Sequence, residues 1–222
     1  MKKLVRGNAP LCLAQFKHGQ DNWSVIREKN LGKDIWEKLD IMQQGFCAYC
    51  ECSLYINGSR GHIEHFIQRD KDPHLTFDWG NLFGSCNNKN RCGTYKDNNR
   101  LAKGIDLSKV CKPDMMGSSD LILFLNSGKV RPRTNLGSNE KELASNTIAA
   151  FNLDGDSKLE NSRRTAINAE KSLADTYWEM SVEYGGDLAE LLKEELAAAL
   201  LRIKKIEYST ALEHLWKDNE QY

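Results

Sequence analysis

The chain has 222 residues, and its 31 basic side chains balance 31 acidic ones, so the size corresponds to one large domain or two small ones. With 40% hydrophobic and 28% charged residues the composition is that of a globular protein, which excludes extensive disorder. The mean hydropathy is −0.59 and no apolar run approaches the roughly 20 residues that cross a bilayer, which excludes a membrane-spanning protein.

The start of the chain carries charge but no apolar stretch of the kind that a secretory signal contains. We therefore expect a cytoplasmic protein with no membrane partner. The zero net charge conceals an asymmetry: residues 1–117 hold 18 Lys or Arg against 13 Asp or Glu, which leaves 13 against 18 for residues 118–222. This distribution is compatible with a phosphate-binding N-terminal part and an acidic C-terminal part, and also with ordinary scatter.

The first predicted element is an amphipathic helix over 33–44, because Ile35, Leu39 and Met42 recur at helical spacing and Gly45 follows. Residues 47–104 are rich in Gly, Asn, Asp and Lys, with only short apolar pieces. Such a loop-rich module buries little core, and modules of this kind often rely on a structural metal. Residues 121–132 then predict two short strands joined by an Asn-Ser-Gly turn.

The remainder of the chain has a helical pattern. Residues 138–151 and 157–184 predict two helices separated by an Asn-Leu-Asp-Gly-Asp turn, and the apolar positions of 187–217 predict one long helix. The fold class predicted is therefore α+β. We expect a helical lead-in over 1–46, a loop-rich module over 47–117, and a β-hairpin plus helical region over 118–222.

Seven cysteines, at 12, 47, 50, 52, 86, 92 and 111, are an odd number and argue against a disulfide framework in the cytoplasm. Cys47 and Cys50 form a CxxC pair, while Cys86 and Cys92 are separated by five residues where two are usual. Tetrahedral zinc takes four such soft ligands, so we predict a structural Zn²⁺ at Cys47, Cys50, Cys86 and Cys92. Cysteines that merely pack in the core and a redox CxxC are the alternatives. We expect Cys52 to point elsewhere, and Cys12 and Cys111 to be small core residues.

The segment Gly-His-Ile-Glu-His-Phe at 61–66 places a carboxylate directly before a histidine. Hydrolysis of a phosphodiester needs a base that deprotonates water and a divalent cation that neutralises charge on the phosphate oxygens. His65 can serve as the base, and Glu64 with an amide oxygen can hold the cation. In an extended strand, however, Glu64 and His65 point to opposite faces unless the strand bends.

Further polar side chains follow within the same module. Asn81 carries an amide suited to holding an imidazole in one orientation, and a later Asn offers an oxygen ligand for Mg²⁺. The basic residues Lys89, Arg91 and Lys96 stand beside these amides, where they could grip flanking phosphates. Each residue alone has an ordinary structural explanation, so it is the order of the motifs that favours a nuclease.

Four motifs carry a resemblance to a known family: Cys-Ala-Tyr-Cys-Glu at 47–51, His-Ile-Glu-His-Phe at 62–66, Phe-Asp-Trp-Gly-Asn-Leu-Phe-Gly-Ser-Cys at 77–86 and Arg-Cys-Gly-Thr-Tyr-Lys-Asp at 91–97. Together they resemble the PtuB-type HNH endonucleases of bacterial anti-phage systems, either Septu or retrons with the same effector pair. The resemblance extends over about residues 33–170. It implies a ββα-metal (His-Me finger) HNH core with a structural zinc.

The resemblance also implies residue roles. His65 would be the general base, Asn81 would orient it, and Glu64 would be a ligand of a catalytic Mg²⁺ or Mn²⁺, where many HNH proteins have Asp. Asn90 is the predicted second ligand, with Asn87 and His62 as alternatives.

The implied function is that of a toxic effector that cleaves nucleic acid, DNA or RNA, in a defence complex. The implied partner is PtuA, an ABC/SMC-like ATPase; retron versions add a reverse transcriptase and its RNA–DNA product. The alternative is a non-catalytic, zinc-stabilised module that binds nucleic acid or protein. An HNH enzyme that works alone is disfavoured because the sequence contains no recognisable sequence-reading module.

Overall fold

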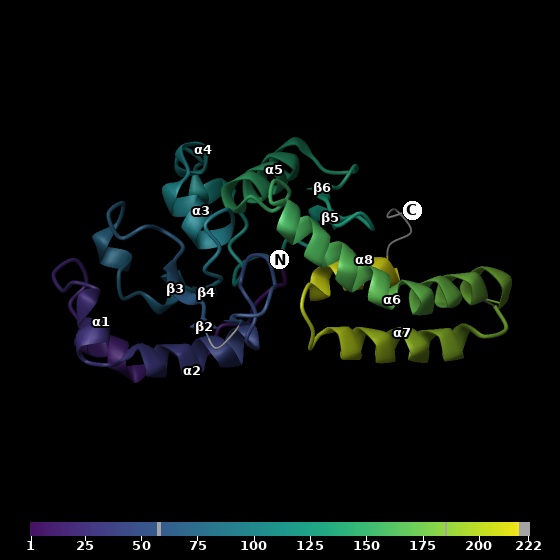
Figure 1. Cartoon of the computed structure of the whole chain (residues 1–222), viewed down its shortest axis with the longest axis horizontal. Coiled ribbons are helices and arrows are strands. Elements are labelled where there is room, and N and C mark those ends of the chain that lie inside the picture. The colour runs from purple at the N-terminus through teal and green to yellow at the C-terminus, as the bar shows by residue number, and fades with distance from the viewer. Residues whose placement is uncertain (57–58, 185, 218–222) are drawn as a thin grey trace.

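The computed structural model describes residues 1–56, 59–184 and 186–217 (Figure 1). Its fold is α+β, as predicted, and the described residues form three two-stranded sheets. The N-terminal part contains α1 (Ser24–Glu28) and α2 (Gly32–Gln43). Helix α2 confirms the first predicted element, and it ends because Gln44 and Gly45 adopt left-handed backbone conformations with φ of 57° and 79°. Its buried side chains Ile35 and Leu39 belong to the hydrophobic core, and α2 packs against β4 (Leu82–Ser85).

The central part is built on a β-hairpin followed by a helix. Its elements are β1 (Tyr55–Ile56), β2 (Ser59–Arg60), β3 (His62–His65), β4, α3 (Cys92–Asn98) and α4 (Arg100–Lys103). Strands β3 and β4 pair antiparallel, with Glu64 opposite Phe83 and His65 opposite Leu82. In Figure 1 this hairpin lies between α2 and α3. The hairpin and the helix that follows it therefore place the Glu64–His65 pair close to the start of α3.

Two further predictions are confirmed after this unit. Strands β5 (Ile122–Phe124) and β6 (Val130–Pro132) form the second predicted hairpin, and α5 (Ser138–Phe151) has the predicted bounds. The Glu140 carboxylate accepts a hydrogen bond from the Gly137 backbone N–H at 3.0 Å, which satisfies a donor at the start of α5. The helix ends at Asn152, whose φ is 49°.

The prediction of one helix over 187–217 is wrong. Helix α6 (Ser157–Tyr184) matches its predicted range, but the next segment divides into α7 (Ala189–Ile203) and α8 (Ser209–Lys217). The chain turns at Tyr208, whose φ is 59°. The cause is distant in sequence: the Glu51 carboxylate accepts hydrogen bonds from the Thr210 backbone N–H at 2.8 Å and the Ser209 hydroxyl at 3.0 Å, which caps α8. The buried face of α8 then packs on α6 and β5.

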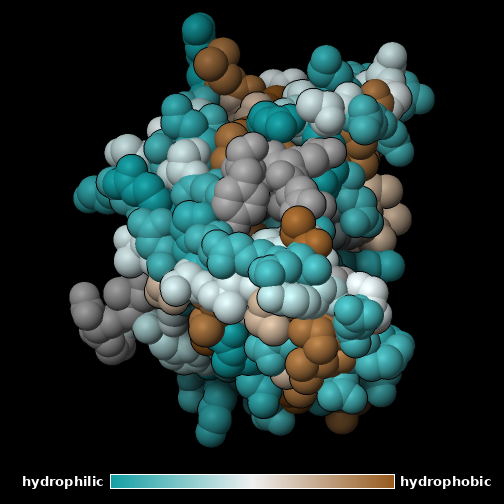
Figure 2. Space-filling view, turned by 90° about the vertical axis from the view of Figure 1, so that its right-hand side faces the viewer, coloured by the Kyte–Doolittle hydropathy of each residue, from teal (hydrophilic) through white to brown (hydrophobic). Residues whose placement is uncertain are grey.

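The hydrophobic core runs through all three predicted segments, from Leu39 through Phe83 and Phe151 to Trp216. Helices α6 and α7 form an arm that extends from this core (Figure 1). The view onto the end of the molecule where the arm lies shows a mostly hydrophilic surface with separate apolar patches (Figure 2). Among the described residues, no helix is both long enough and apolar enough to cross a bilayer.

Candidate functional site

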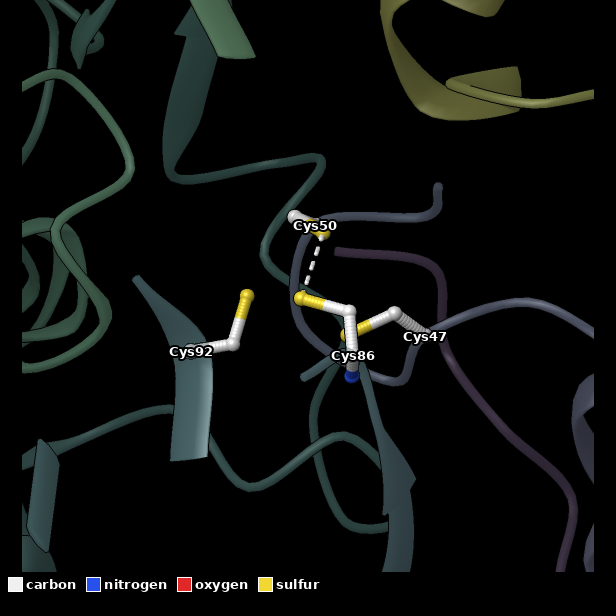
Figure 3. A group of neighbouring side chains, drawn as sticks. All are labelled: Cys47, Cys50, Cys86 and Cys92. Atoms are coloured by element: carbon white, nitrogen blue, oxygen red, sulfur yellow. Dashed lines mark hydrogen bonds between the residues drawn. The ribbon is translucent and has the colours of Figure 1, made fainter. Parts of the chain in front are cut away.

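The four cysteines predicted as zinc ligands converge. The sulfur atoms of Cys47, Cys50, Cys86 and Cys92 all lie within 4.8 Å of one another, and all four residues are buried (Figure 3). The Sγ atoms of Cys50 and Cys86 are 4.0 Å apart. Four sulfurs about 2.3 Å from a tetrahedral zinc would be about 3.8 Å apart, so the cluster is compatible with structural zinc.

Local backbone geometry explains how the two pairs meet. The first pair sits in a tight turn in which the Glu51 backbone N–H donates to the Cys47 carbonyl at 3.0 Å, and the Cys86 backbone N–H points at Cys47 Sγ at 3.4 Å. The wide second pair is accommodated because the residues between its cysteines fold outward as a turn. There the Asn152 amide donates to the Asn90 carbonyl at 2.7 Å, and Cys92 enters α3 with a φ of 58°.

The remaining cysteines are only partly as predicted. Cys52 does not point away from the cluster: it is buried, and its Sγ lies 3.4 Å from that of Cys50, although it is not one of the four convergent residues. Cys111 is buried as expected, whereas Cys12 is half-buried. Hydrogen bonding with Cys47 and Cys50 lowers the pKa of Cys86, whereas hydrogen bonding with Cys47 raises the pKa of Cys50 and burial raises that of Cys92.

Two guanidinium groups are buried beside the thiols. Arg91 Nη1 lies 2.6 Å from Asp156 Oδ2, and Arg163 Nη1 donates to the Leu153 carbonyl at 2.7 Å. The charges of both arginines interact with Cys50 and Cys92. Four thiolates around a dication would leave a net charge of −2, which the two arginines offset in part, because Arg91 is also paired with Asp156. The expectation that Arg91 grips phosphate is therefore wrong, because its side chain is buried and paired with Asp156.

A separate polar cavity of about 570 Å³ opens beside the β3–β4 hairpin and α3. Its lining includes His62, Glu64 and His65 from β3, and Thr94 and Asp97 from α3. Glu64 and His65 both line this cavity although they are adjacent in the strand, because His65 is the last residue of β3. The structure thus brings together the predicted base and the predicted carboxylate ligand.

The His65 imidazole is held in one tautomer. Its Nε2 lies 3.0 Å from the carbonyl oxygen of Thr76, and a carbonyl can only accept, so Nε2 carries the proton and Nδ1 has the lone pair. The Trp23 ring packs edge-on against the imidazole at a centroid distance of 4.5 Å. Burial lowers the pKa of His65 to about 4. The ring is accordingly neutral at neutral pH.

Asn81 is buried next to this histidine but does not bond to its imidazole. The Asn81 amide donates to the carbonyls of Ile67 at 2.9 Å and Leu75 at 3.1 Å, and its oxygen accepts from the Ile67 backbone N–H at 2.7 Å. Leu75 directly precedes Thr76, the acceptor for His65. Asn81 therefore binds the backbone of the loop between β3 and β4, and Thr76 of the same loop accepts the hydrogen bond from the His65 imidazole.

Glu64 is only 3% exposed and has a different neighbour at each oxygen. Oε1 lies 2.9 Å from Lys96 Nζ, and Oε2 lies 3.4 Å from His62 Nε2. The Lys96 ammonium also donates to the His65 backbone carbonyl at 3.1 Å and pairs with Asp97. The expectation that Lys96 grips phosphate is wrong, because its side chain is 2% exposed and bound to these partners.

The predicted second metal ligand, Asn90, is not brought to the cavity. Its residue is exposed in the turn before α3. Of the two alternatives, His62 lines the cavity, whereas Asn87 is exposed outside the lining but has its Oδ1 3.1 Å from His62 Nδ1. Sequence reasoning also missed the roles of Gly93 and Asp97. Helical spacing from Cys92 could have found them, because positions 93, 96 and 97 share one face of α3.

Comparison with known proteins adds one relation. No family model matches the chain. Among curated proteins, the Septu protein PtuB of Bacillus thuringiensis is 35% identical over 71 residues, which cover 29% of this chain and 26% of that protein. The match thus spans about a quarter of the length of the curated relative. The chain is similar to a Septu protein over part of its length.

Proposed function

We propose that the chain is a metal-dependent HNH endonuclease that hydrolyses phosphodiester bonds of nucleic acid and acts as the effector of a Septu-type anti-phage system. The observation that carries the proposal is the pairing of His65 and Glu64 at one open cavity, on a hairpin that leads into a helix. The partial similarity to the Septu protein PtuB supports the biological setting.

In this mechanism His65 takes the proton from the attacking water. Its Nε2–H bond to Thr76 leaves the Nδ1 lone pair available, and Asn81 keeps the loop that carries Thr76 in place. Lys96 fixes the backbone of His65 and one oxygen of Glu64. A divalent cation held at Glu64, Mg²⁺ or Mn²⁺, would neutralise the charge that develops on the phosphate oxygens.

A structural zinc at the four cysteines completes the proposal. The tetrathiolate site would be closed, because four protein ligands fill a tetrahedral zinc, and it would hold the start of α3 against the turn that carries Cys47. Zinc at this place therefore supports the position of α3 in the cavity wall without taking part in the reaction.

The surroundings of the cavity support a phosphate-rich substrate. A neighbouring cavity of about 560 Å³ shares His62, Ile63 and Arg69 with the first, so the two are adjacent. The exposed cations Arg27, Arg69 and Lys103 line this pair of cavities. A nucleic-acid strand lying along them would meet these cations at its phosphates, beside the acidic Asp70 and Asp97 that also line the first cavity.

A partner is implied by the resemblance rather than by the site. PtuB-type proteins pair with the ATPase PtuA, and retron versions add a reverse transcriptase and its RNA–DNA product. We propose that the region over 118–222 docks such a partner. The zero net charge of the chain is consistent with a weak grip on nucleic acid by the isolated protein, which strengthens in the complex.

The test is cleavage of DNA and RNA by the complex with its ATPase partner, with Mg²⁺ or Mn²⁺ present. His65→Ala should reduce cleavage by about 10²- to 10⁴-fold, the usual contribution of a general base. His74→Ala is the matched control, since His74 is exposed outside both cavities. Equal cleavage by the wild type and His65→Ala contradicts the proposal. Nucleic-acid binding without cleavage by the wild type would favour the non-catalytic module.

A further inference from the structure

We propose that His62 is the second protein ligand of the divalent cation, that Asn87 orients it, and that the resulting nitrogen–oxygen pair selects Mn²⁺ over Mg²⁺. This inference rests on the proposed function, which assigns the cation to Glu64. In this proposal His62, whose side chain already lies beside that of Glu64 in the cavity lining, takes the place of the exposed Asn90 as the second ligand.

The first observation is the approach of two side chains on one face of β3. His62 and Glu64 are two residues apart in the strand and therefore point the same way. His62 Nε2 lies 3.4 Å from Glu64 Oε2. Two adjacent ligands at roughly 2.1–2.2 Å from an octahedral cation are about 3 Å apart, so a small side-chain adjustment brings both atoms to one ion.

The second observation is the tautomer of His62, which its neighbour fixes. The Asn87 amide nitrogen donates to the Arg60 carbonyl at 2.7 Å, so the amide oxygen is the atom that faces His62 Nδ1 at 3.1 Å. Nδ1 must then carry a proton, and Nε2 is the ring nitrogen that lies 3.4 Å from Glu64 Oε2. A ring nitrogen and a carboxylate oxygen come this close stably only with a cation or a proton between them. A polar group on the far nitrogen is also the usual arrangement for a metal-bound imidazole.

The third observation is that the two oxygens of the Glu64 carboxylate have different neighbours. Lys96 occupies the Oε1 side at 2.9 Å, which leaves Oε2 as the oxygen for an ion. A β-carbon at Gly93 would lie 2.3 Å from Oε2, so Glu64 can hold this position only because residue 93 is glycine. The His62 side chain is 34% exposed, so water or a phosphate oxygen can reach the same place from the cavity.

The ligand types determine the metal class. Mg²⁺ prefers oxygen ligands, whereas an imidazole nitrogen favours first-row transition metals, and Mn²⁺ accepts both carboxylate and imidazole. A site made of Glu64 and His62 should therefore bind Mn²⁺ more tightly than Mg²⁺. The competing explanation is a plain ion pair, in which a protonated His62 neutralises Glu64 and no metal binds between them.

The experiment measures Mn²⁺ binding to the zinc-loaded full chain by electron paramagnetic resonance, with pulsed detection of ¹⁴N coupling. The wild type should bind one Mn²⁺ with an imidazole ¹⁴N signal. His62→Ala should abolish this signal and weaken binding by more than tenfold, and Asn87→Ala should weaken binding by about tenfold, as expected for an outer-shell partner. Glu64→Gln should remove the site, and His74→Ala should change nothing.

The outcomes separate this inference from the proposed function. Glu64-dependent Mn²⁺ binding that lacks ¹⁴N coupling and is unchanged in His62→Ala overturns the inference, while nuclease activity that depends on His65 would still stand. An absence of Glu64-dependent Mn²⁺ binding, or equal affinity for Mg²⁺ and Mn²⁺, also overturns it. A His62-coordinated Mn²⁺ in a protein that cleaves no nucleic acid supports the inference and contradicts the nuclease.

Discussion

The two polar centres of this protein meet at the first turn of α3 and differ in how closed they are. Cys92, the first residue of α3, belongs to a cluster of four buried sulfurs within 4.8 Å of one another. Gly93 and Lys96 contact Glu64 at the edge of an open cavity of about 570 Å³. A closed set of four soft ligands suits a structural ion, whereas a catalytic site needs open positions for water and substrate. Substitutions in the first centre should therefore change stability, and those in the second should mainly change binding and chemistry.

Loss of a cysteine should have the largest effect. Cys47→Ala removes one of the four convergent sulfurs, and a structural zinc contributes on the order of 10 kcal/mol to small zinc modules. We expect loss of zinc and a large fall in the melting temperature, measured by metal analysis and thermal unfolding. Cys12→Ala is the control, because Cys12 is half-buried away from the cluster. Unchanged zinc content and stability in Cys47→Ala would show that the cysteines merely pack in the core.

Lys96→Met tests whether the ammonium under Glu64 is structural. The change keeps most of the apolar side chain but leaves the buried Glu64 and the half-buried Asp97 without their shared cation. Breaking such a buried ion pair costs about 3–5 kcal/mol, which urea unfolding can measure. The exposed Lys89→Met is the matched control. If both variants unfold alike, Lys96 is free to contact phosphate as the sequence indicated; added Glu64→Gln should recover part of the loss.

Gly93→Ala should lower the affinity for Mn²⁺ more than it lowers the stability of the fold. The new methyl group would overlap Glu64 Oε2, and overpacking of this kind costs about 1–3 kcal/mol. Because Glu64 must move, we expect Mn²⁺ affinity to fall more than stability does, measured by titration and thermal unfolding on the same sample. Gly104→Ala is the control, since its β-carbon would meet only the Leu101 carbonyl at an ordinary 3.5 Å. Full metal affinity in Gly93→Ala would mean that the cation does not use Oε2.

Elements determined by local sequence were predicted well, and those determined by distant contacts were not. The periodicity and turn signals of α2, β5, β6, α5 and α6 lie within each segment, so their predicted ranges nearly match the structure. The break between α7 and α8 depends on Glu51, which lies 159 residues before Thr210. No sequence pattern within 187–217 predicts the contact between Thr210 and Glu51. The burial of Lys96 and Arg91 is equally invisible locally, because their partners Glu64 and Asp156 come from other elements.

The choice among the asparagines shows the same limit, and it gives the smallest expected effect. Asn87 and Asn90 have the same chemistry and are three residues apart, so spacing alone could not choose between them. The turn places Asn87 between Arg60 and His62, whereas Asn90 offers its backbone carbonyl to Asn152 and its side chain remains outside the cavity lining. Asn90→Ala keeps that carbonyl. We therefore expect a change in unfolding free energy within about 0.5 kcal/mol, the usual range for surface substitutions, and unchanged Mn²⁺ affinity and cleavage. A tenfold loss of metal affinity in Asn90→Ala, with Asn87→Ala unaffected, would reinstate Asn90 as the ligand, and the turn before α3 would then have to fold inward when the cation binds.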